Sequence, residues 1–370
     1  MRLDAVPENL LERIALRAGV VPTPLGDTIV AMTLARTIMV ATKLGVFEAL
    51  AKGACTAHEI ATRCGLDQHA TEVLLFALAG AGYARSKGTR YTLAPVARKW
   101  LLKSSPQSLY DYMLFNFLNW TWDEGFEDFI RTGKPARIHQ EMSHDEWRVY
   151  QRAMRSLANF SAFEVARRTP VPRGALHMLD IGGSHGYYSV MFCRRHPRLH
   201  SVVFDLPEAV VHAAKIHAQE GMGERIVHRA GNALTDDLGN EEYDLIFIGS
   251  LLHHFNEKAN RDLVQRSVRA LRPGGYLVIE EFQRFQSPKE VGELGALSNL
   301  YFAATSEAGT WSMQEIAAWQ REAGLIPRKP IRLLTAPGAE LQAALKPTSN
   351  GKQVQSRMND DRQKQAISRE

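Results

Sequence analysis

The sequence has few cysteines and no strong excess of either charge. Its three cysteines, Cys55, Cys64 and Cys193, are too few and too scattered for a disulfide framework or a metal site. The 45 lysines and arginines exceed the 40 aspartates and glutamates by only five, and they are spread along the chain. A nucleic-acid-binding surface needs basic residues gathered on one face. We therefore expect a protein of a reducing compartment that holds no metal and binds no nucleic acid.

Long uninterrupted apolar segments are also missing. The most apolar early segment, residues 29–44, is interrupted by Arg36 and Lys43, which argues against a membrane span. The N-terminus mixes acidic with apolar residues and lacks the apolar core of a secretory signal. The 45% hydrophobic and 23% charged residues are typical of a globular protein. We expect a cytoplasmic protein without a membrane partner.

Residues 1–108 are expected to form a helical domain of the winged-helix type. The apolar positions of residues 28–50 recur at helical spacing on most sides, as in a helix buried in its own domain or against a second subunit. Thr56 and Glu59 have the spacing of a capping box, and Gly65 suits the end of that helix. The segment RYTLAPVARKWL predicts a short strand pair, the wing.

A winged-helix domain raises the alternative of a DNA-binding regulator that senses a small ligand. In that fold the recognition helix meets phosphates and base edges through polar and basic side chains. The corresponding segment here, HATEVLLFALAGAG, contains no arginine or lysine. We therefore favour a dimerisation domain, and hence a homodimer, over the regulator.

The rest of the chain divides into three further parts. Residues 109–170 are helical in pattern and rich in aromatic residues, and we expect them to connect the domains and to contribute to a pocket for a flat organic molecule. Residues 171–337 alternate apolar strands with helices, which predicts a doubly wound, mostly parallel α/β sheet. Residues 338–370 are expected to be a disordered polar tail. The predicted strands are HMLDI, SVVFD, RIVHRA, YDLIFIG and GYLVIEEF.

A glycine-rich turn, DIGGSHG, follows the first strand of the predicted sheet. Ligands of such sheets bind beyond the carboxyl ends of the strands. The turn lacks the G-x-G-x-x-G of dinucleotide-binding proteins, and the chain has no phosphate-binding G-x-x-x-x-G-K-[ST] loop. Asp180 precedes the glycines, and a carboxylate there suits a ligand with an ammonium and a sulfonium group, such as S-adenosylmethionine. Asp205 ends the second strand, where ribose hydroxyls bind in this class of fold.

The order of these segments resembles the plant-type and bacterial small-molecule O-methyltransferases, the family of caffeic acid and hydroxyindole O-methyltransferases. The resemblance covers about residues 28–335 and includes the DIGGSHG, FDLPEAV, RAGNAL, LLHHF, LRPGG and SMQEIAAWQREAGL segments. It implies a class I methyltransferase sheet with one antiparallel strand, S-adenosylmethionine as cofactor, a small-molecule methyl acceptor and a homodimer.

The resemblance also implies a set of cofactor-binding residues. The glycine turn would hold the methionine part, Asp205 the ribose, and Asn232 and Ala233 would lie beside the adenine. The sequence departs from the family at Ser184, at Asn232 and at Gly249, where a glycine, an aspartate and, in many plant members, a lysine are usual. The adenine contacts therefore stay open. The expected cofactor-binding residues are Asp180, Gly182, Gly183, Gly186, Asp205, Leu206, Asn232, Ala233 and Gly249.

Methyl transfer to a hydroxyl needs a base, and the fourth strand ends near a histidine pair. A histidine is the usual general base for removing a proton from a phenol or alcohol. Alignment of LLHHF with the L-H-D-W segment of the family puts His253 on the catalytic histidine, although histidines here also occur in methyltransferases that use no base. Glu281 matches the orienting carboxylate by position. Glu280 is the alternative, because neighbouring strand residues face opposite sides.

The acceptor and the reaction are less constrained by the sequence. Aromatic residues and methionines at helical spacing serve as core more often than as pocket. The same family contains C-methyltransferases, so a C- or N-methyltransferase without a histidine base is an alternative to the O-methyltransferase. Candidates for the acceptor pocket are Met154, Phe160, Asn299, Phe302 and Trp311.

Overall fold

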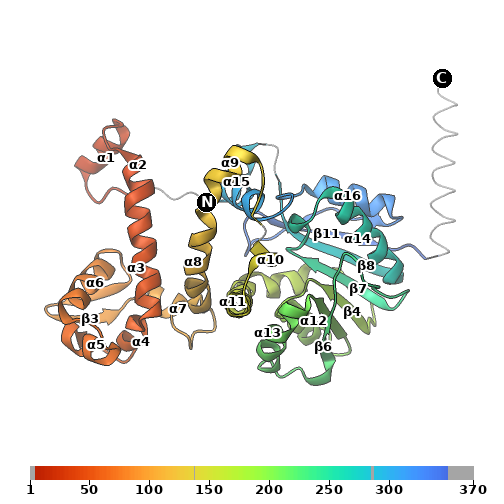
Figure 1. The fold of residues 1–370 in the computed structure, drawn as a ribbon, viewed down its shortest axis with the longest axis horizontal. Coiled ribbons are helices and arrows are strands. Elements are labelled where there is room, and N and C mark those ends of the chain that lie inside the picture. The colour runs from red at the N-terminus through yellow and green to blue at the C-terminus, as the bar shows by residue number, and fades with distance from the viewer. Residues whose placement is uncertain (1–4, 137, 285–286, 349–370) are drawn as a thin grey trace. The chain divides into compact units, whose positions relative to one another are not determined.

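The computed structural model describes residues 5–136, 138–284 and 287–348, and the chain divides into two compact units (Figure 1). The first unit comprises Met1–Asp123 and Arg152–Leu157. The second comprises Glu124–Gln151 and Ala158–Glu370. The predicted boundary at residue 108 thus lies one helix before the observed one, and the helix that contains residues 152–157 contributes to both units.

The first unit is a bundle of helices with a small sheet. Its elements are α1 (Leu10–Arg17), α2 (Thr23–Leu25), the π-helical turn η1 (Gly26–Val30), α3 (Ala31–Lys43), α4 (Val46–Ala51), β1 (Cys55–Thr56), α5 (Ala57–Cys64), α6 (Gln68–Gly80), β2 (Ala84–Lys87), β3 (Arg90–Leu93), α7 (Pro95–Trp100) and α8 (Tyr110–Asp123). Strands β2 and β3 pair as an antiparallel hairpin, the predicted wing, and β1 pairs with β3.

Local sequence signals account for the ends of these helices. The capping box of α5 is confirmed, because the Thr56 hydroxyl accepts from the Glu59 amide and the Glu59 carboxylate accepts from the Thr56 amide. Gly65 ends α5 in the left-handed conformation, with φ +65°. Helix α8 belongs to this unit because its aromatic rings pack on α3, where the Arg36 guanidinium lies over the ring of Trp120 at 4.7 Å.

The second unit contains a large sheet covered by helices. Its elements are α9 (Phe126–Thr132), α10 (Ile138–Glu141), α11 (His144–Arg168), β4 (His177–Ile181), α12 (Tyr187–Arg195), β5 (His200–Asp205), α13 (Pro207–Ala218), η2 (Gly223–Arg225), β6 (Ile226–Ala230), β7 (Tyr243–Gly249), η3 (Leu252–His254), α14 (Glu257–Ala270), β8 (Leu271–Phe282), α15 (Pro288–Thr305), α16 (Met313–Glu322), β9 (Ile326–Pro327), β10 (Ile331–Arg332) and β11 (Ala339–Leu345).

The sheet has the predicted doubly wound architecture. Its strand order is β10-β11-β8-β7-β4-β5-β6, with β9 paired to β11. Strands β4 to β8 run parallel, and β11 is antiparallel to β8. Because the strand order reverses beside β4, the loops after β4 and β7 flank the point where such sheets bind ligands.

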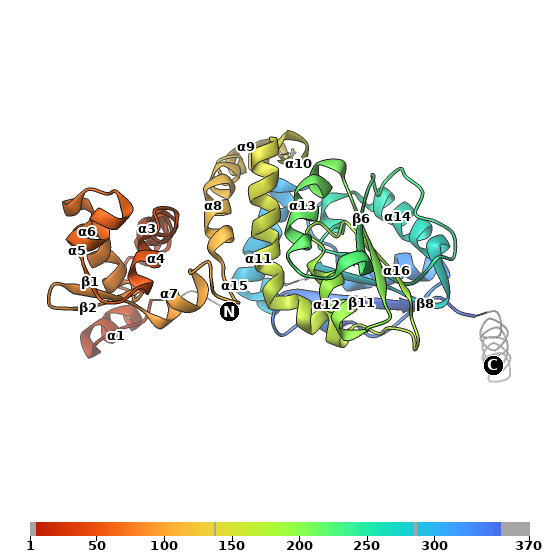
Figure 2. The ribbon, with the colours of Figure 1, turned by 90° about the horizontal axis from the view of Figure 1, so that it is seen from below.

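Alternate residues of the central strands face two separate cores. Ile246 and Ile248 of β7 pack with side chains of α14 and α16, whereas Leu245 and Phe247 pack with α11 and α12. Figures 1 and 2 show these helix pairs on the two faces of the sheet. Burial on both faces explains why these strands read as continuous apolar runs in the sequence.

One prediction of the sequence is wrong. Residues 339–345 were assigned to a disordered tail, yet they form β11 and pair with β8 along its length. Leu341, Ala343 and Ala344 of this strand are buried in the core. The segment AELQAAL has small residues and a glutamine, so its apolar character is weak, and its pairing partner is more than fifty residues away. The remainder of that predicted tail, residues 349–370, lies outside the described residues.

Candidate active site

The glycine turn joins β4 to α12 at the carboxyl edge of the sheet. Gly182 has φ +67°, and its amide donates to the Phe204 carbonyl of β5 at 2.8 Å. A Cβ on Gly183 would lie 2.6 Å from Cγ of Asp180, so no side chain fits there. Gly186, with φ +72°, opens α12. The backbone of the turn is therefore held close to β5, free of side chains at its tightest points.

Asp180 lies beneath the turn rather than above it. Its side chain is only 1% exposed, and the Ser189 hydroxyl donates to its Oδ2 at 2.6 Å. Burial raises the pKa of Asp180 to about 7. From the sequence, Asp180 is expected to face a positively charged ligand. The structure instead buries it, where it supports the backbone of Gly183 from below.

Asp205 ties the turn to the end of β5. Its Oδ2 accepts from the Ser184 amide and its Oδ1 from the Leu206 amide, each at 2.7 Å. Burial raises the pKa of Asp205 to about 6, which leaves the group mainly ionised at neutral pH. A carboxylate oxygen has two lone pairs, so both oxygens can still accept from a hydroxyl of a ligand.

Ser184 stands where the family usually has a glycine, and its backbone keeps the glycine conformation. Its φ is +52°, in the left-handed region that is costly for residues with a Cβ. Its hydroxyl donates to Oε1 of the buried Gln151 on α11 at 2.6 Å. This bond links the turn to α11. The sequence analysis did not find Gln151, because nothing near it in sequence marks it as a partner of the turn.

The residues expected beside the adenine lie at the ends of β6 and β7. The Asn232 side chain accepts from the Leu234 amide at 2.9 Å, so it stabilises the turn after β6. The carbonyl of Ala233 accepts from Arg266 of α14. At Gly249 a Cβ would lie 2.8 Å from the Phe247 ring, so the lysine of many plant members has no room there. The structure thus gives a steric reason for that departure from the family.

His253 is held by a buried carboxylate. Its Nδ1 lies 2.8 Å from Oε1 of Glu281, and its backbone amide donates to Oε2 of the same residue at 3.3 Å. Glu281 is fully buried and His253 is 3% exposed. The Phe302 ring packs on the imidazole with 4.3 Å between ring centroids. The imidazole therefore has one orientation, with Nδ1 on Glu281 and Nε2 left for another partner.

Glu280, the competing carboxylate, points elsewhere. The Ser250 hydroxyl donates to its Oε2 at 2.9 Å, and the Ser250 amide donates to its backbone carbonyl. Burial, then the negative charge of Glu281, raises the pKa of Glu280 to about 7. Neighbouring residues of β8 face opposite sides, so the sequence left both Glu280 and Glu281 as candidates. The contacts show that Glu281 meets His253 and that Glu280 meets Ser250.

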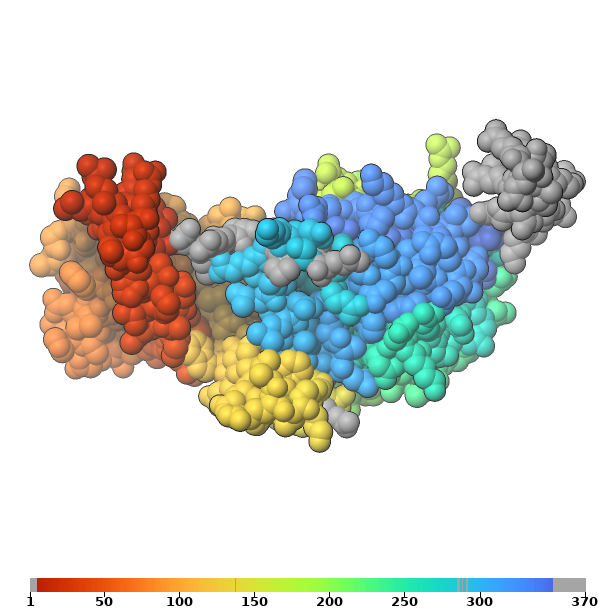
Figure 3. Space-filling model, turned by 90° about the horizontal axis from the view of Figure 1, so that it is seen from above, coloured from red at the N-terminus to blue at the C-terminus, as the bar shows by residue number. Residues whose placement is uncertain are grey.

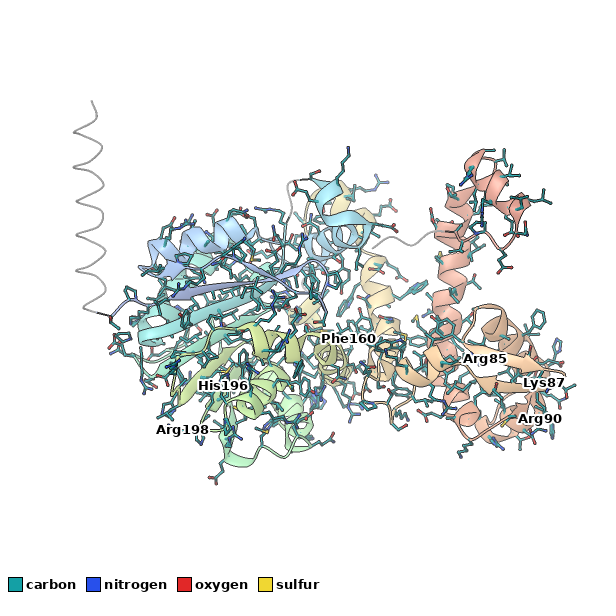
Figure 4. All side chains as sticks on the ribbon, turned by 180° about the vertical axis from the view of Figure 1, so that it is seen from behind. Arg85, Lys87, Arg90, Phe160, His196 and Arg198 are labelled. Atoms are coloured by element: carbon teal, nitrogen blue, oxygen red, sulfur yellow. The ribbon has the colours of Figure 1, made fainter. Side chains whose placement is uncertain are left out.

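The five pocket candidates lie in different surroundings. Phe302 packs against His253, as described above. Trp311 belongs to the core beneath α16, where its indole nitrogen donates to the Leu252 carbonyl at 3.0 Å and so supports η3. Asn299 accepts from Thr310. Phe160 is partly buried on α11 (Figure 4), and Met154 lies in the segment of α11 grouped with the first unit.

Two further histidines adjoin His253. The ring of His254 lies 4.1 Å from that of His253, and the ring of His139 on α10 lies 4.4 Å from that of His254. Burial lowers the pKa of His139 to about 4 and the pKa of His254 well below its ordinary value, so both imidazoles are neutral at pH 7. The sequence analysis missed His139, since a single histidine in a polar stretch carries no signal of its own.

A family model described as the O-methyltransferase domain matches residues 127–325, more than half of the chain. The chain belongs to the O-methyltransferase family. The O-methyltransferase dimerisation domain matches residues 27–104, within the first unit. The chain is thus an S-adenosylmethionine-dependent O-methyltransferase with a dimerisation domain at its N-terminal side.

Individual relatives are distant in sequence but match most of the chain. A 3-hydroxy-5-methyl-1-naphthoate 3-O-methyltransferase of Streptomyces sahachiroi is 26% identical over 332 residues, which are 86% of this chain and 93% of that one. An N,N-dimethyltransferase of Streptomyces rimosus is 27% identical over 329 residues, 85% and 93% of the two chains. The structure of human N-acetylserotonin methyltransferase in complex with S-adenosylmethionine shares the fold, with a TM-score of 0.78 at 20% identity, covering 93% of this chain and all of that one.

The residues of the turn fit the cofactor of the family. β4, β5 and β6 run parallel side by side, so the glycine turn, Asp205 and the turn after β6 meet at one edge of the sheet. Glycines allow a ligand to approach the backbone closely, and ionised Asp205 can accept from two vicinal hydroxyls such as those of a ribose. S-adenosylmethionine has a ribose with two vicinal hydroxyls for Asp205 and a methionine part that can lie against the glycine backbone.

Proposed function

We propose that this O-methyltransferase methylates a hydroxyl group of a small aromatic or polyketide-like molecule, with His253 as the general base. The observation that carries this proposal is the buried pair of His253 and Glu281, whose atoms Nδ1 and Oε1 are 2.8 Å apart. A histidine oriented by a carboxylate, with its second nitrogen left over, is the arrangement of a general base. We further propose that Gly182, Gly183, Gly186, Asp205 and Leu206 form the cofactor site.

The proposed chemistry follows from the hydrogen bond between His253 and Glu281. With Nδ1–H of His253 hydrogen-bonded to Glu281, Nε2 carries a lone pair. Nε2 takes the proton of the acceptor hydroxyl. Held at the glycine turn and Asp205, S-adenosylmethionine would supply an activated methyl group to this oxygen and a neutral thioether as the leaving group. Glu281 stabilises the imidazolium that results, and the partly buried ring of Phe302, packed against His253, helps to keep acceptor and base aligned.

A flat aromatic acceptor is supported by the side chains around the base. His253 packs against Phe302, and Phe302 packs against Phe282 with 5.4 Å between ring centroids. Pockets for small organic molecules are lined mainly by apolar and aromatic groups with few polar ones. We propose that residues 109–170 contribute the other side of this pocket. The naphthoate methyltransferase among the relatives acts on an acceptor of this shape, as its name states.

Incubation with labelled S-adenosylmethionine and a panel of phenols, naphthols and aromatic polyketides tests this proposal. We expect label in at least one product as a methyl ether, located by mass spectrometry and NMR. His253→Asn should lose transfer while binding S-adenosylhomocysteine as tightly as the wild type does. No transfer to any member of the panel, or full transfer by the variant, would contradict the proposal.

Methylation at nitrogen or carbon is the second candidate, and one relative supports it. The Streptomyces rimosus relative is named an N,N-dimethyltransferase, although it matches this chain over a similar length. An amine or an activated carbon needs no strong base, so His253 would then only shape the pocket. The position of the new methyl group in the product decides between the two, because an ether carbon differs from an N- or C-methyl carbon in its NMR shift.

We propose that the molecule is a homodimer that works in the cytoplasm. Apolar side chains of η1 and α3 are more than half exposed in the single chain, Ile29 at 61%, Val30 at 60% and Met32 at 55%. These helices lie at the surface of the first unit (Figure 3). A cavity of about 560 Å³ also opens there, beside Met32 and Arg36. Large exposed apolar patches mark interaction sites, and the family model for dimerisation covers this segment.

The stretch Thr23–Lys43 is also long and apolar enough to cross a membrane by length and composition alone. It overlaps the dimerisation match, which begins at residue 27, so a second copy of the chain accounts for its apolar surface.

One feature of the first unit supports the alternative function of a DNA-binding regulator. Arg85, Lys87 and Arg90 project from the β2–β3 hairpin (Figure 4). Arg90 is already paired with Glu59 at 3.4 Å, and α6, in the place of a recognition helix, contains no arginine or lysine. Three basic residues on a hairpin are fewer than a phosphate-binding face requires. Salt-dependent binding of duplex DNA would revive this alternative.

A further inference from the structure

Five aromatic rings form a continuous row in the second unit, with three imidazoles in its middle. Between neighbours the ring centroids are 4.3 Å apart for Phe302 and His253, 4.1 Å for His253 and His254, 4.4 Å for His254 and His139, and 5.2 Å for His139 and Tyr150. Only His253 has a part in the proposed reaction. The row therefore places two additional hydrogen-bonding rings beside the base.

The ring of His254 is fixed in one orientation. Its Nδ1 lies 3.1 Å from the Ser306 hydroxyl, directly after α15, and the planes of the His254 and His139 rings meet at 73°. The ring of His139 has no hydrogen-bond partner among the residues that the structure describes, and it is only partly exposed. Polar atoms in such surroundings normally have a partner. Nε2 of His254 and the nitrogens of His139 are therefore available to a ligand.

Both additional imidazoles are uncharged at neutral pH. Burial is the first cause that lowers the pKa of each, and each is also disfavoured by a proton on a neighbouring imidazole. A neutral imidazole offers one N–H donor and one lone pair. It can therefore pair with a hydroxyl or a carbonyl but brings no charge to balance a carboxylate, whose burial beside a second acidic side chain, that of Glu281, is costly.

We propose that His254 and His139 form a subsite for a second, uncharged oxygen on the acceptor, next to the hydroxyl that is methylated. The acceptor class is then a vicinal diol or a hydroxy-ketone of an aromatic system, in preference to a simple phenol or an aromatic hydroxy acid. This inference rests on the proposed function, because it takes the reacting hydroxyl to lie at His253. Both imidazoles are acceptor-positioning residues, and neither exchanges the reacting proton.

Three naphthalene probes of equal ring size test this subsite. Calorimetry on the full chain loaded with S-adenosylhomocysteine measures the affinities of 2-naphthol, 2,3-dihydroxynaphthalene and 3-hydroxy-2-naphthoate. We expect the diol to bind roughly threefold to tenfold more tightly than 2-naphthol, the range that one neutral hydrogen bond supplies. The hydroxy acid should bind no more tightly than the diol. Equal affinities for the diol and the naphthol, tightest binding of the hydroxy acid, or no binding of any probe would overturn the inference.

Substitutions assign the preference to the two histidines. His139→Leu and His254→Leu should bring the ratio of diol to naphthol affinity close to one, with the affinity for S-adenosylhomocysteine unchanged. His139→Gln keeps a hydrogen-bonding group and should retain most of the preference, which separates recognition from folding. His200→Leu is the matched control, because His200 is exposed at the start of β5, away from the carboxyl edge of the sheet. A preference that persists in both leucine variants would overturn the assignment.

The two proposals fail in different ways. If methyl groups are transferred to the acceptor panel but diol and naphthol bind alike, only the subsite is wrong. If the diol preference depends on His139 and His254 but no acceptor is methylated, the proposed function is wrong and the subsite stands as a binding site.

Discussion

Asp180 is a buried carboxyl group hydrogen-bonded by Ser189. The Ser189 hydroxyl donates to its Oδ2 at 2.6 Å, and burial raises the pKa of Asp180 to about 7 from the ordinary 3.8. The Asp180 side chain lies directly against the backbone of Gly183. A Cβ on Gly183 would overlap the Asp180 carboxyl carbon. An acid at this position is therefore part of the turn itself.

This burial predicts a pH dependence of stability. Between about pH 4 and pH 7 the folded chain keeps a proton on Asp180 that the unfolded chain releases, so the stability that this group contributes is present below pH 4 and is lost as pH rises through 7. Asp180→Asn has no such proton. The free energy of unfolding of the variant minus that of the wild type should therefore rise between pH 4 and 7, measured by urea denaturation. The exposed Asp237→Asn is the control, and a flat difference for Asp180→Asn would contradict the assigned burial.

Ser184 predicts a second effect at the scale of one residue. Ser184→Ala removes the hydroxyl that donates to the buried Gln151 but keeps the strained φ of +52°. The loss of a partner for a buried amide costs about 1–3 kcal/mol of unfolding free energy. Ser184→Gly loses the same bond but relieves the backbone strain, so it should be less destabilised than the alanine variant. Denaturation of the three proteins measures the order, and an alanine variant at least as stable as the glycine variant would contradict it.

At the scale of elements, the stability of helix α16 depends on the capping residue that precedes it, Ser312. Ser312 and Glu315 form a capping box, with the Ser312 hydroxyl accepting from the Glu315 amide at 3.2 Å, and the helix buries Met313, Ile316 and Trp319 in one of the two cores. Ser312→Ala should lower the unfolding free energy by about 1 kcal/mol. Ser298→Ala, within α15, removes only a bond to the Leu294 carbonyl of its own helix and should change stability by less than half as much.

Elements with strong local signals were predictable from the sequence. The five parallel strands, the capped helix α5 and the glycine turn each depend on apolar runs or cap residues within a few positions. Strand β11 was not predictable, because its residues are only weakly apolar and β8, its partner, supplies the pairing. The sequence also could not tell whether Glu280 or Glu281 meets His253. The answer depends on which side of β8 faces η3.

The candidate site could be predicted only in part, because some of its residues come from distant helices. His253, the glycine turn and Asp205 follow strands directly, so their place at the carboxyl edge follows from the order of elements. His139 lies on α10, Gln151 on α11, and Ser306 directly after α15, and only packing brings them to the turn and the histidines. Contacts between distant helices leave no periodic trace in the sequence.

At the scale of the whole molecule, the exposed face of η1 and α3 predicts association. Ile29→Asp and Met32→Asp place a charge on side chains that are 61% and 55% exposed in one chain. If this face is buried against a second copy, each variant should shift the protein from dimer to monomer in sedimentation velocity at micromolar concentration, because burial of an unpaired charge is costly.

Val211→Asp, which charges an exposed position of α13, is the control for this shift. It should leave the dimer intact. A wild-type protein that sediments as a monomer, or variants at positions 29 and 32 that remain dimers, would show that this face is not the dimer interface.

The central claim is that His253, oriented by Glu281, removes the proton of the acceptor. The most direct measurement compares single-turnover methyl transfer from labelled S-adenosylmethionine in the wild type, His253→Asn and Glu281→Gln, with S-adenosylhomocysteine affinity measured on the same samples. We predict a loss of about 100-fold to 10,000-fold for His253→Asn, the range that a general base supplies, a smaller loss for Glu281→Gln, and unchanged affinity in both. A transfer rate in His253→Asn within a few-fold of the wild type would contradict the account.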